Sequence, residues 1–313
     1  MNRFFAFGCS FTNYKWPTWA DILAREFNYY ENWGQQGGGN SFIFYSLMEC
    51  ITRNKITKDD TIIIMWSTIV REDRYLKNHW VTPGCIYTQN VYSKDFVDKF
   101  ADPIGYFIRD CANISAANCI LKSIGCNYHF LSMTPIDTVN DYNENYYEFL
   151  SNLLNCKKIN NVKKIYKKDL DLIKPSVFEV VFNCNWASRI EDLWFKTDDQ
   201  LAENSREFSK FSIKYNFVRG DDWPTLAEFK ILKNLDNLSP DIKSEILEIF
   251  NGKNFQEMKL NDTFKSYDHH PTPALHLEYI DKVLPYTISQ KTRKWAIDGP
   301  WVKSSHEKKV KRF

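Results

Sequence analysis

Ser10 stands where a side chain can act as a nucleophile. It follows the short apolar run Arg3–Phe7 and a glycine, and a helical pattern begins soon after it. Such a run predicts a buried parallel strand, and ligands of open α/β sheets bind beyond the carboxyl ends of strands. Backbone N–H groups there can stabilise an oxyanion. The pattern predicts a nucleophile at Ser10, with Cys9 as a rival, or else an ordinary turn.

A base for this nucleophile is available in the segment 267–273. It reads Tyr-Asp-His-His-Pro-Thr-Pro, which predicts a loop entering a helix. The carboxylate of Asp268 can orient the imidazole of His270, which then takes a proton from a serine. The alternatives are a surface loop without function or half of a metal site. Metal is disfavoured because the remaining histidines show no ligand spacing with this pair.

Glycines are concentrated in a third segment. The chain has only 11, and four of them lie in Asn32–Ser41, which reads Asn-Trp-Gly-Gln-Gln-Gly-Gly-Gly-Asn-Ser. Glycine is needed where backbone approaches another group closely or adopts a positive φ. A phosphate cradle is the weaker interpretation, because the segment matches neither the P-loop nor the dinucleotide fingerprint.

These three segments, in this order, resemble the sequence blocks of the SGNH (GDSL-like) hydrolase family. The family's Gly-Asp-Ser block, with its nucleophilic serine, reads Gly-Cys-Ser here and ends at Ser10. The second block has a glycine whose N–H enters the oxyanion hole, and Gly37 matches it. The last block has Asp and His before Pro, matched by Asp268 and His270. The resemblance covers residues 1–135 and 260–288.

The resemblance implies a serine esterase with a Ser10–His270–Asp268 triad and no cofactor or metal. His270 would act as base and then acid, while the N–H groups of Ser10 and Gly37 stabilise the oxyanion. We expect removal of an O-acyl group, most simply acetyl, from a carbohydrate-type substrate, that is, a small-molecule or glycan ester. Two alternatives remain open: an O-acyltransferase using the same residues, and a catalytically impaired SGNH-like binding or structural module.

The sequence departs from the family pattern in three ways. Cys9 replaces the Asp of the first block, and the Asp-to-His spacing of the last block is one residue short, with His269 as a rival base. The family's Gly-x-Asn block, after the third strand, has no Asn here. That Asn is an oxyanion donor, and one donor is worth about 10²–10³ in turnover. We expect Asn40 or Ser67 to replace it.

Aromatic residues make up 16% of the chain, and several border the predicted site. We expect Trp16, Trp33 and Trp66 to bind substrate, because aromatic faces suit sugar rings; core packing is the alternative for each. Arg71, in the charged run 71–74, could bind an anionic substrate, or the run could be a solvated surface.

Strand and helix patterns alternate along the segments that must position these residues. This alternation predicts an α/β fold, which we expect to be a three-layer α/β/α sandwich with a mostly parallel sheet (SGNH- or flavodoxin-like) and a helical insertion. We expect strands at Arg3–Phe7, Thr61–Trp66 and Tyr128–Met133, and helices at Pro17–Phe27, at Ser41–Ile51 with Ser41 as cap, at Ile104–Ile124 with Gly125 as C-cap, and at Pro273–Val283.

The chain has 313 residues and a formal net charge of +2. We expect an α/β catalytic core at 1–139 and 256–290, a helical insertion or cap at 140–255 and a solvated basic tail at 291–313. No apolar run is long enough to span a membrane, and eight scattered cysteines predict reduced thiols in the cytoplasm. Nucleic-acid binding is disfavoured by the balanced charge. The pattern predicts no particular oligomer.

Overall fold

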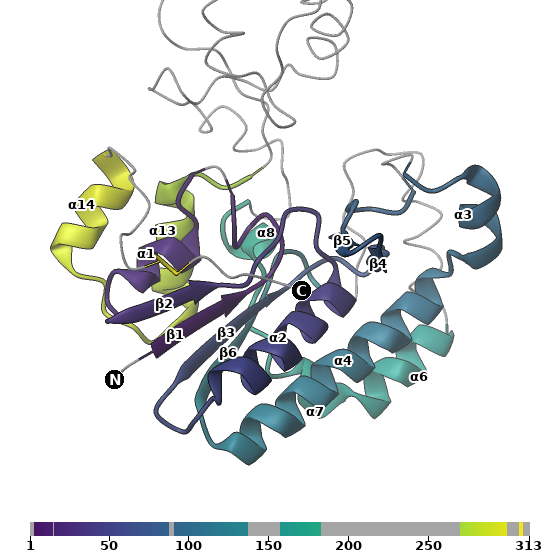
Figure 1. Ribbon diagram of the computed structural model, residues 1–313, viewed down its shortest axis with the longest axis horizontal. Helices are drawn as coiled ribbons and strands as arrows, with labels where there is room; N and C mark the ends of the chain where they lie inside the picture. The colour runs from purple at the N-terminus through teal and green to yellow at the C-terminus, as the bar shows by residue number, and fades with distance from the viewer. Residues whose placement is uncertain are drawn as a thin grey trace, which may run out of the picture. The chain divides into compact units, whose positions relative to one another are not determined.

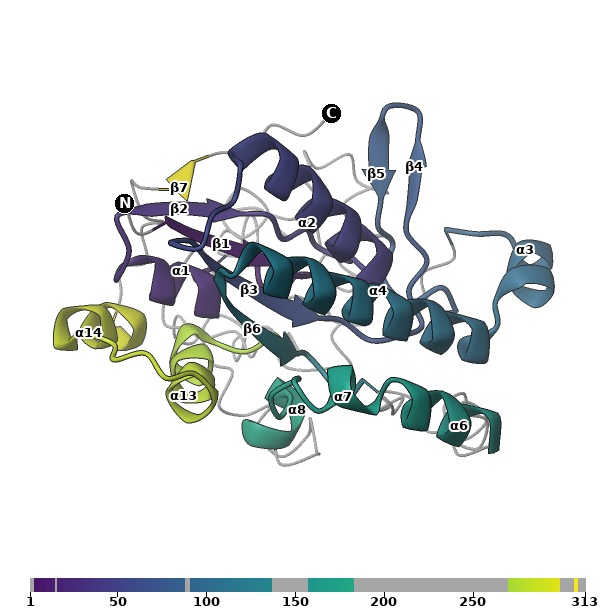
Figure 2. The same cartoon turned by 90° about the horizontal axis from the view of Figure 1, so that it is seen from below.

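A parallel β-sheet lies at the centre of the structure, a computed structural model that describes residues 3–14, 16–87, 91–136, 157–182, 270–298 and 307–308. The strands lie in the order β6-β3-β1-β2-β7, and every pairing is parallel. Figure 1 labels the first four of these strands, and Figure 2 also labels β7. Their bounds are β1 (Arg3–Phe7), β2 (Tyr29–Asn32), β3 (Thr61–Trp66), β6 (Asn127–Ser132) and β7 (Glu307–Lys308). The α/β fold class is therefore confirmed.

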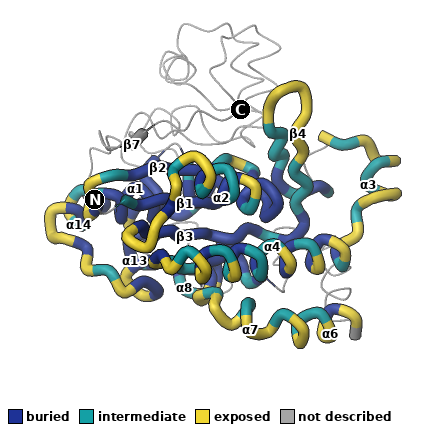
Figure 3. Tube along the Cα trace, turned by 60° about the horizontal axis from the view of Figure 1, so that its bottom comes forward, coloured by how far each residue is buried: buried dark blue, intermediate teal, exposed yellow. Residues whose placement is uncertain are grey.

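Helices pack against both faces of the sheet, because alternate side chains of β1 point to opposite sides. Phe5 and Phe7 belong to a buried cluster with side chains of α2 (Asn40–Asn54) and α4 (Pro103–Ile124). Phe4 points the other way and lies 6.3 Å from Trp19 (ring centroids), the first residue of α1 (Trp19–Ala24), which packs on α13 (Pro273–Val283). Figures 2 and 3 show these helices and the buried strands between them.

The structure confirms most of the expected elements, with small shifts at their ends. β1, β3 and α13 have the expected bounds, and α4 ends at Gly125, whose φ of 76° is that of a left-handed C-cap. β6 begins one residue earlier than expected. α1 begins later than expected because Thr18 and Asp21 form a capping box before Trp19, and it ends at Ala24, before the expected Phe27.

The expectation that Ser41 caps α2 is wrong. The helix follows Gly39, and its N-terminal N–H groups are bound by a distant carboxylate. Asp73 accepts hydrogen bonds from the backbone N–H groups of Gly39 (2.8 Å) and Phe42 (3.0 Å). A carboxylate at this end also complements the helix dipole.

A hairpin that the sequence analysis missed follows β3. Its strands β4 (Arg74–Leu76) and β5 (His79–Val81) pair in antiparallel fashion. Lys77 and Asn78 connect them with φ of 49° and 68°, the positive values of a type I′ turn. A further helix, α3 (Lys94–Phe100), precedes α4.

Part of the expected insertion packs with the core. The short helices α6 (Lys157–Ile165) and α7 (Lys167–Leu170) contact α4, and α8 (Val177–Val180) contacts α13. The chain divides into one unit of residues 1–185 and 270–313 and a second of 186–269. The rest of the expected insertion, 140–156 and 183–255, lies outside the described residues.

Residues 291–298 of the expected basic tail belong to α14 (Gln290–Asp298), which packs on α13. Ala296 is fully buried, and the Arg25 guanidinium lies 4.4 Å from the ring centroid of Trp295. None of the helices in the described part of the chain is long and apolar enough to cross a membrane.

Candidate active site

The structure brings together Ser10 and His270, which are 260 positions apart in the sequence. His270 Nε2 lies 2.7 Å from Ser10 Oγ, a hydrogen-bond distance. Ser10 lies in the turn after β1, where the N–H groups of Thr12 (2.9 Å) and Asn13 (3.1 Å) donate to the carbonyl of Cys9. When the imidazole carries its proton on Nδ1, Nε2 can accept the proton of the serine.

The residues that follow Ser10 hold His270 in place. The ring of Tyr14 stacks on the imidazole at 3.9 Å between centroids and an interplanar angle of 15°, and Phe11 contacts it edge-on at 5.3 Å. Trp16 Nε1 donates to the carbonyl of Pro271 (2.9 Å). One short loop therefore carries the nucleophile and orients the base.

Gly8 allows the chain to turn this tightly after β1. A Cβ at this position would lie 2.0 Å from Oγ1 of Thr12. A larger residue would thus push apart the turn that presents Ser10.

Cys9, the rival nucleophile, points into the core. It is fully buried, and its thiol donates to Met133 Sδ at 3.6 Å. The geometry therefore favours Ser10, whereas Asp268 and His269 lie outside the described residues and their roles stay predictions.

The glycine-rich segment lies beside the turn of Ser10. Asn32 Nδ2 donates to the carbonyl of Thr12 (2.8 Å), and the Gln35 N–H donates to that of Gly8 (3.1 Å). Gly37 has a φ of +72°, so its backbone requires glycine. Within the described part of the chain the N–H groups of Ser10 and Gly37 have no hydrogen-bond partner. They are the two donors that the sequence predicts for the oxyanion.

Asn40 is engaged elsewhere. Its amide nitrogen donates to the carbonyl of Ser67 (3.1 Å) and to Asp110 Oδ2 (2.7 Å), and its Oδ1 accepts the Ser67 N–H (2.7 Å). Both amide hydrogens are used, so this arrangement leaves none for an oxyanion. Burial raises the pKa of Asp110 to about 6, although Arg109 lies beside it at 2.8 Å. The role expected of Asn40 is thus opposed by its contacts.

Ser67 remains a candidate donor. It is fully buried directly after β3, the strand beside β1, and its hydroxyl has no partner among the residues that the structure describes. The hydroxyl is therefore available at the edge of the sheet where Ser10 lies.

Arg71 is half-buried and bonded to the glycine-rich segment, so it is not a fully solvated charge. Its Nη1 donates to the carbonyl of Gly38 (2.9 Å), and its Nη2 lies 3.8 Å from Met133 Sδ, which also contacts Cys9. Its predicted role in binding an anionic group stays open.

The expectation that three tryptophans bind substrate is wrong, because Trp16, Trp33 and Trp66 are at most 2% exposed and pack in the core. Two exposed aromatic rings, one on α2 and one on β4, lie against Trp80 of the hairpin. Tyr45 (54% exposed) stacks on Trp80 at 5.6 Å, and Tyr75 (46% exposed) contacts it edge-on at 5.7 Å. The sequence analysis could not predict that these rings lie together, because it did not predict the hairpin.

Sequence reasoning also missed His276, on α13. It is 1% exposed, and its ring lies 6.3 Å from that of Phe11. Burial, with a smaller contribution from the nearby His270, lowers the pKa of His276 to about 3, so the ring is neutral at physiological pH.

The described residues contain no group of three or more His, Cys, Asp or Glu that could hold a metal ion. No protein-family model matches this chain, and no curated protein matches it either.

Proposed function

We propose that this chain is a serine esterase with an SGNH-like three-layer core, which removes an O-acyl group, most simply acetyl, from a carbohydrate-type ester. The observation that carries the proposal is the 2.7 Å contact between Ser10 Oγ and His270 Nε2. A hydroxyl in contact with an imidazole, at the carboxyl edge of a parallel sheet, is the arrangement that acyl transfer needs.

In the proposed mechanism His270 Nε2 takes the proton of Ser10 as the oxygen attacks the ester carbonyl. The N–H groups of Ser10 and Gly37 stabilise the tetrahedral oxyanion, and His270 then gives its proton to the leaving alcohol. Water repeats the sequence on the acyl-enzyme and releases the acid. Asp268 is expected to hold the imidazole in the required tautomer.

Two features support the choice of substrate. Ser10 is only 7% exposed, which favours a small acyl group. The exposed rings of Tyr45 and Tyr75 lie beside Trp80, whose carbonyl accepts from the glycine-segment residue Gln35 (3.4 Å), and exposed aromatic faces suit sugar rings.

Hydrolysis of p-nitrophenyl acetate by the purified protein tests the proposal. We expect Ser10→Ala to lower turnover by about 10³-fold or more. The matched control is Cys9→Ala, which changes the neighbouring nucleophile and should leave turnover unchanged. Equal activity in wild type and Ser10→Ala would refute the assignment.

A catalytically impaired binding module is the second candidate, and the engaged amide of Asn40 favours it. Saturable binding of an acetylated glycan, without Ser10-dependent release of acetate, would establish this alternative.

A further inference from the structure

The segment 71–84, which contains the hairpin, holds the backbone of the glycine segment at three consecutive carbonyls. These contacts run from Thr82 Oγ1 to Gln36 O (2.8 Å), from Gly84 N to Gly37 O (3.1 Å) and from Arg71 Nη1 to Gly38 O (2.9 Å). The first of them fixes the peptide that bears the N–H of Gly37, the predicted oxyanion donor.

The direction of that N–H follows from the geometry of the peptide bond. In a trans peptide the C=O of Gln36 and the N–H of Gly37 point in opposite directions. Because the carbonyl points to Thr82, the N–H points away from the hairpin. The same segment is also bound to the end of β1, where the Gln35 N–H donates to the carbonyl of Gly8 (3.1 Å), two residues before Ser10. The hairpin and the turn that carries Ser10 are thus both bonded to this segment.

This peptide has an alternative orientation. Residues 35–38 form a turn closed by the Gly38 N–H and the carbonyl of Gln35 (3.0 Å), and the positive φ of Gly37 at its third position makes it type II. Type I differs mainly by a flip of the central peptide, and glycine at this position adopts either sign of φ. A flip would turn the carbonyl of Gln36 away from Thr82 and reverse the direction of the Gly37 N–H.

We propose that Thr82 is a positioning residue that holds the Gln36–Gly37 peptide with its N–H toward Ser10, so that the hairpin keeps the oxyanion hole formed. This inference rests on the proposed function. Gln35 Nε2 donates to Thr82 Oγ1 (2.9 Å), which leaves the threonine hydrogen for the carbonyl of Gln36. The contact lies at the surface, so water competes with it and the effect of its loss is limited.

Steady-state kinetics of the full chain on p-nitrophenyl acetate test this role. Thr82→Val keeps the shape of the side chain without the hydroxyl, and we expect kcat to fall about 2- to 10-fold with KM unchanged, the range for one neutral hydrogen bond. Thr82→Ser retains the hydroxyl and should restore kcat. Thr52→Val is the matched control, because the Thr52 hydroxyl bonds a carbonyl on the exposed face of α2.

Three results would overturn the inference and leave the esterase proposal standing. They are an unchanged kcat in Thr82→Val, a change in KM but not in kcat in that variant, or a loss of kcat in Thr82→Ser equal to that in Thr82→Val. Wild-type protein without Ser10-dependent turnover would overturn both. Amide NMR gives a second readout: the Gly37 signal should shift in Thr82→Val and return in Thr82→Ser.

Discussion

Residues 9 and 10 carry a thiol and a hydroxyl in adjacent positions, and the fold gives them different surroundings. Both residues lie in the turn that follows β1, beyond the extended backbone of the strand, and this turn directs their side chains to different surroundings. Cys9 contacts Met133, and Ser10 contacts His270. The position of the residue relative to β1, and not the stronger intrinsic nucleophilicity of a thiol, decides which of them meets the base.

The buried neutral His276 makes a contribution to stability that depends on pH. Its pKa in the folded state is about 3, below the value of about 6.5 for an unperturbed histidine, so between these values the unfolded chain binds a proton that the folded chain does not. Stability is therefore lost as pH falls through this window. We expect His276→Leu to flatten the slope by up to about 1.4 kcal/mol per pH unit, measured by urea unfolding at pH 4–6.5.

The control is His79→Gln, because His79 is exposed on the hairpin. The same pH slope in wild type and His276→Leu would contradict the burial of a neutral ring.

At the scale of elements, the local sequence pattern predicts the helices and strands whose ends are determined by residues close to them in the sequence. β3 is a continuous apolar run, and α4 ends at a glycine with positive φ. The sequence analysis did not predict β2 because its sequence Tyr-Tyr-Glu-Asn is polar. The carboxylate of Glu31 can be buried because it accepts hydrogen bonds from Trp33 Nε1 (2.8 Å) and from Nδ2 of the distant Asn54 (2.9 Å). Partners of that kind are known only once the chain is folded.

The residues of the candidate site also fall into those that the sequence predicts and those that it does not. Ser10 and His270 were predicted from residue types in ordered blocks, without any knowledge of packing. Tyr14 and Thr82 were not, because each acts through a contact with a residue far away in the sequence. The tryptophans were misassigned because both faces of the sheet are covered, which places large rings inside.

The cap of α2 gives a prediction that separates the sequence pattern from the structure. Asp73→Ala removes the carboxylate that binds the N–H groups of Gly39 and Phe42, and we expect it to lower the free energy of unfolding by about 1–2 kcal/mol. Ser41→Ala, at the position that the sequence favours as cap, should cost much less. Urea unfolding of the two variants measures both losses of stability. A larger loss in Ser41→Ala than in Asp73→Ala would show that Ser41 caps the helix.

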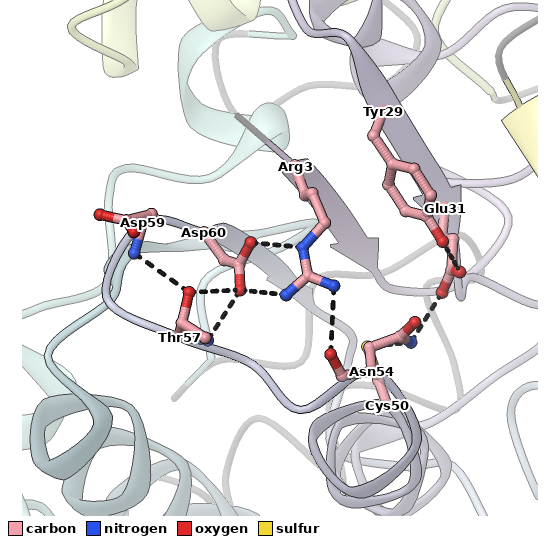
Figure 4. A network of polar contacts seen from close by, with 8 residues as sticks. All are labelled: Arg3, Tyr29, Glu31, Cys50, Asn54, Thr57, Asp59 and Asp60. Atoms are coloured by element: carbon pink, nitrogen blue, oxygen red, sulfur yellow. Dashed lines mark hydrogen bonds and ion pairs between the residues drawn. The ribbon is translucent and has the colours of Figure 1, made fainter. Parts of the chain in front are cut away.

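Over the whole molecule the two ends of the sheet have different roles. The carboxyl end carries Ser10, and the amino end carries an ion pair in which Arg3 Nε and Nη2 donate to Asp60 Oδ1 (2.7 Å) and Oδ2 (2.6 Å) (Figure 4). The Thr57 N–H also donates to Asp60 (2.7 Å). Burial alone would raise the pKa of Asp60, but these hydrogen bonds outweigh it and lower the pKa.

We expect Asp60→Asn to lower the free energy of unfolding at neutral pH by about 1.5–3 kcal/mol, the range for hydrogen bonds to charged groups, and to leave kcat of the folded protein unchanged. The contribution is present above the unfolded pKa of about 3.9 and is lost as pH falls through the lower folded pKa. Asp59→Asn is the control, since Asp59 is exposed. A lower kcat with unchanged stability would contradict this division of roles.

The central claim is that segments from the two ends of the chain meet to form one nucleophilic site, and covalent labelling tests it most directly. The folded protein is incubated with a fluorophosphonate, and the adduct is located by mass spectrometry. The account predicts a single adduct on Ser10, absent in Ser10→Ala and formed far more slowly in His270→Ala. No adduct on folded wild type, or an adduct that persists in Ser10→Ala, would contradict it.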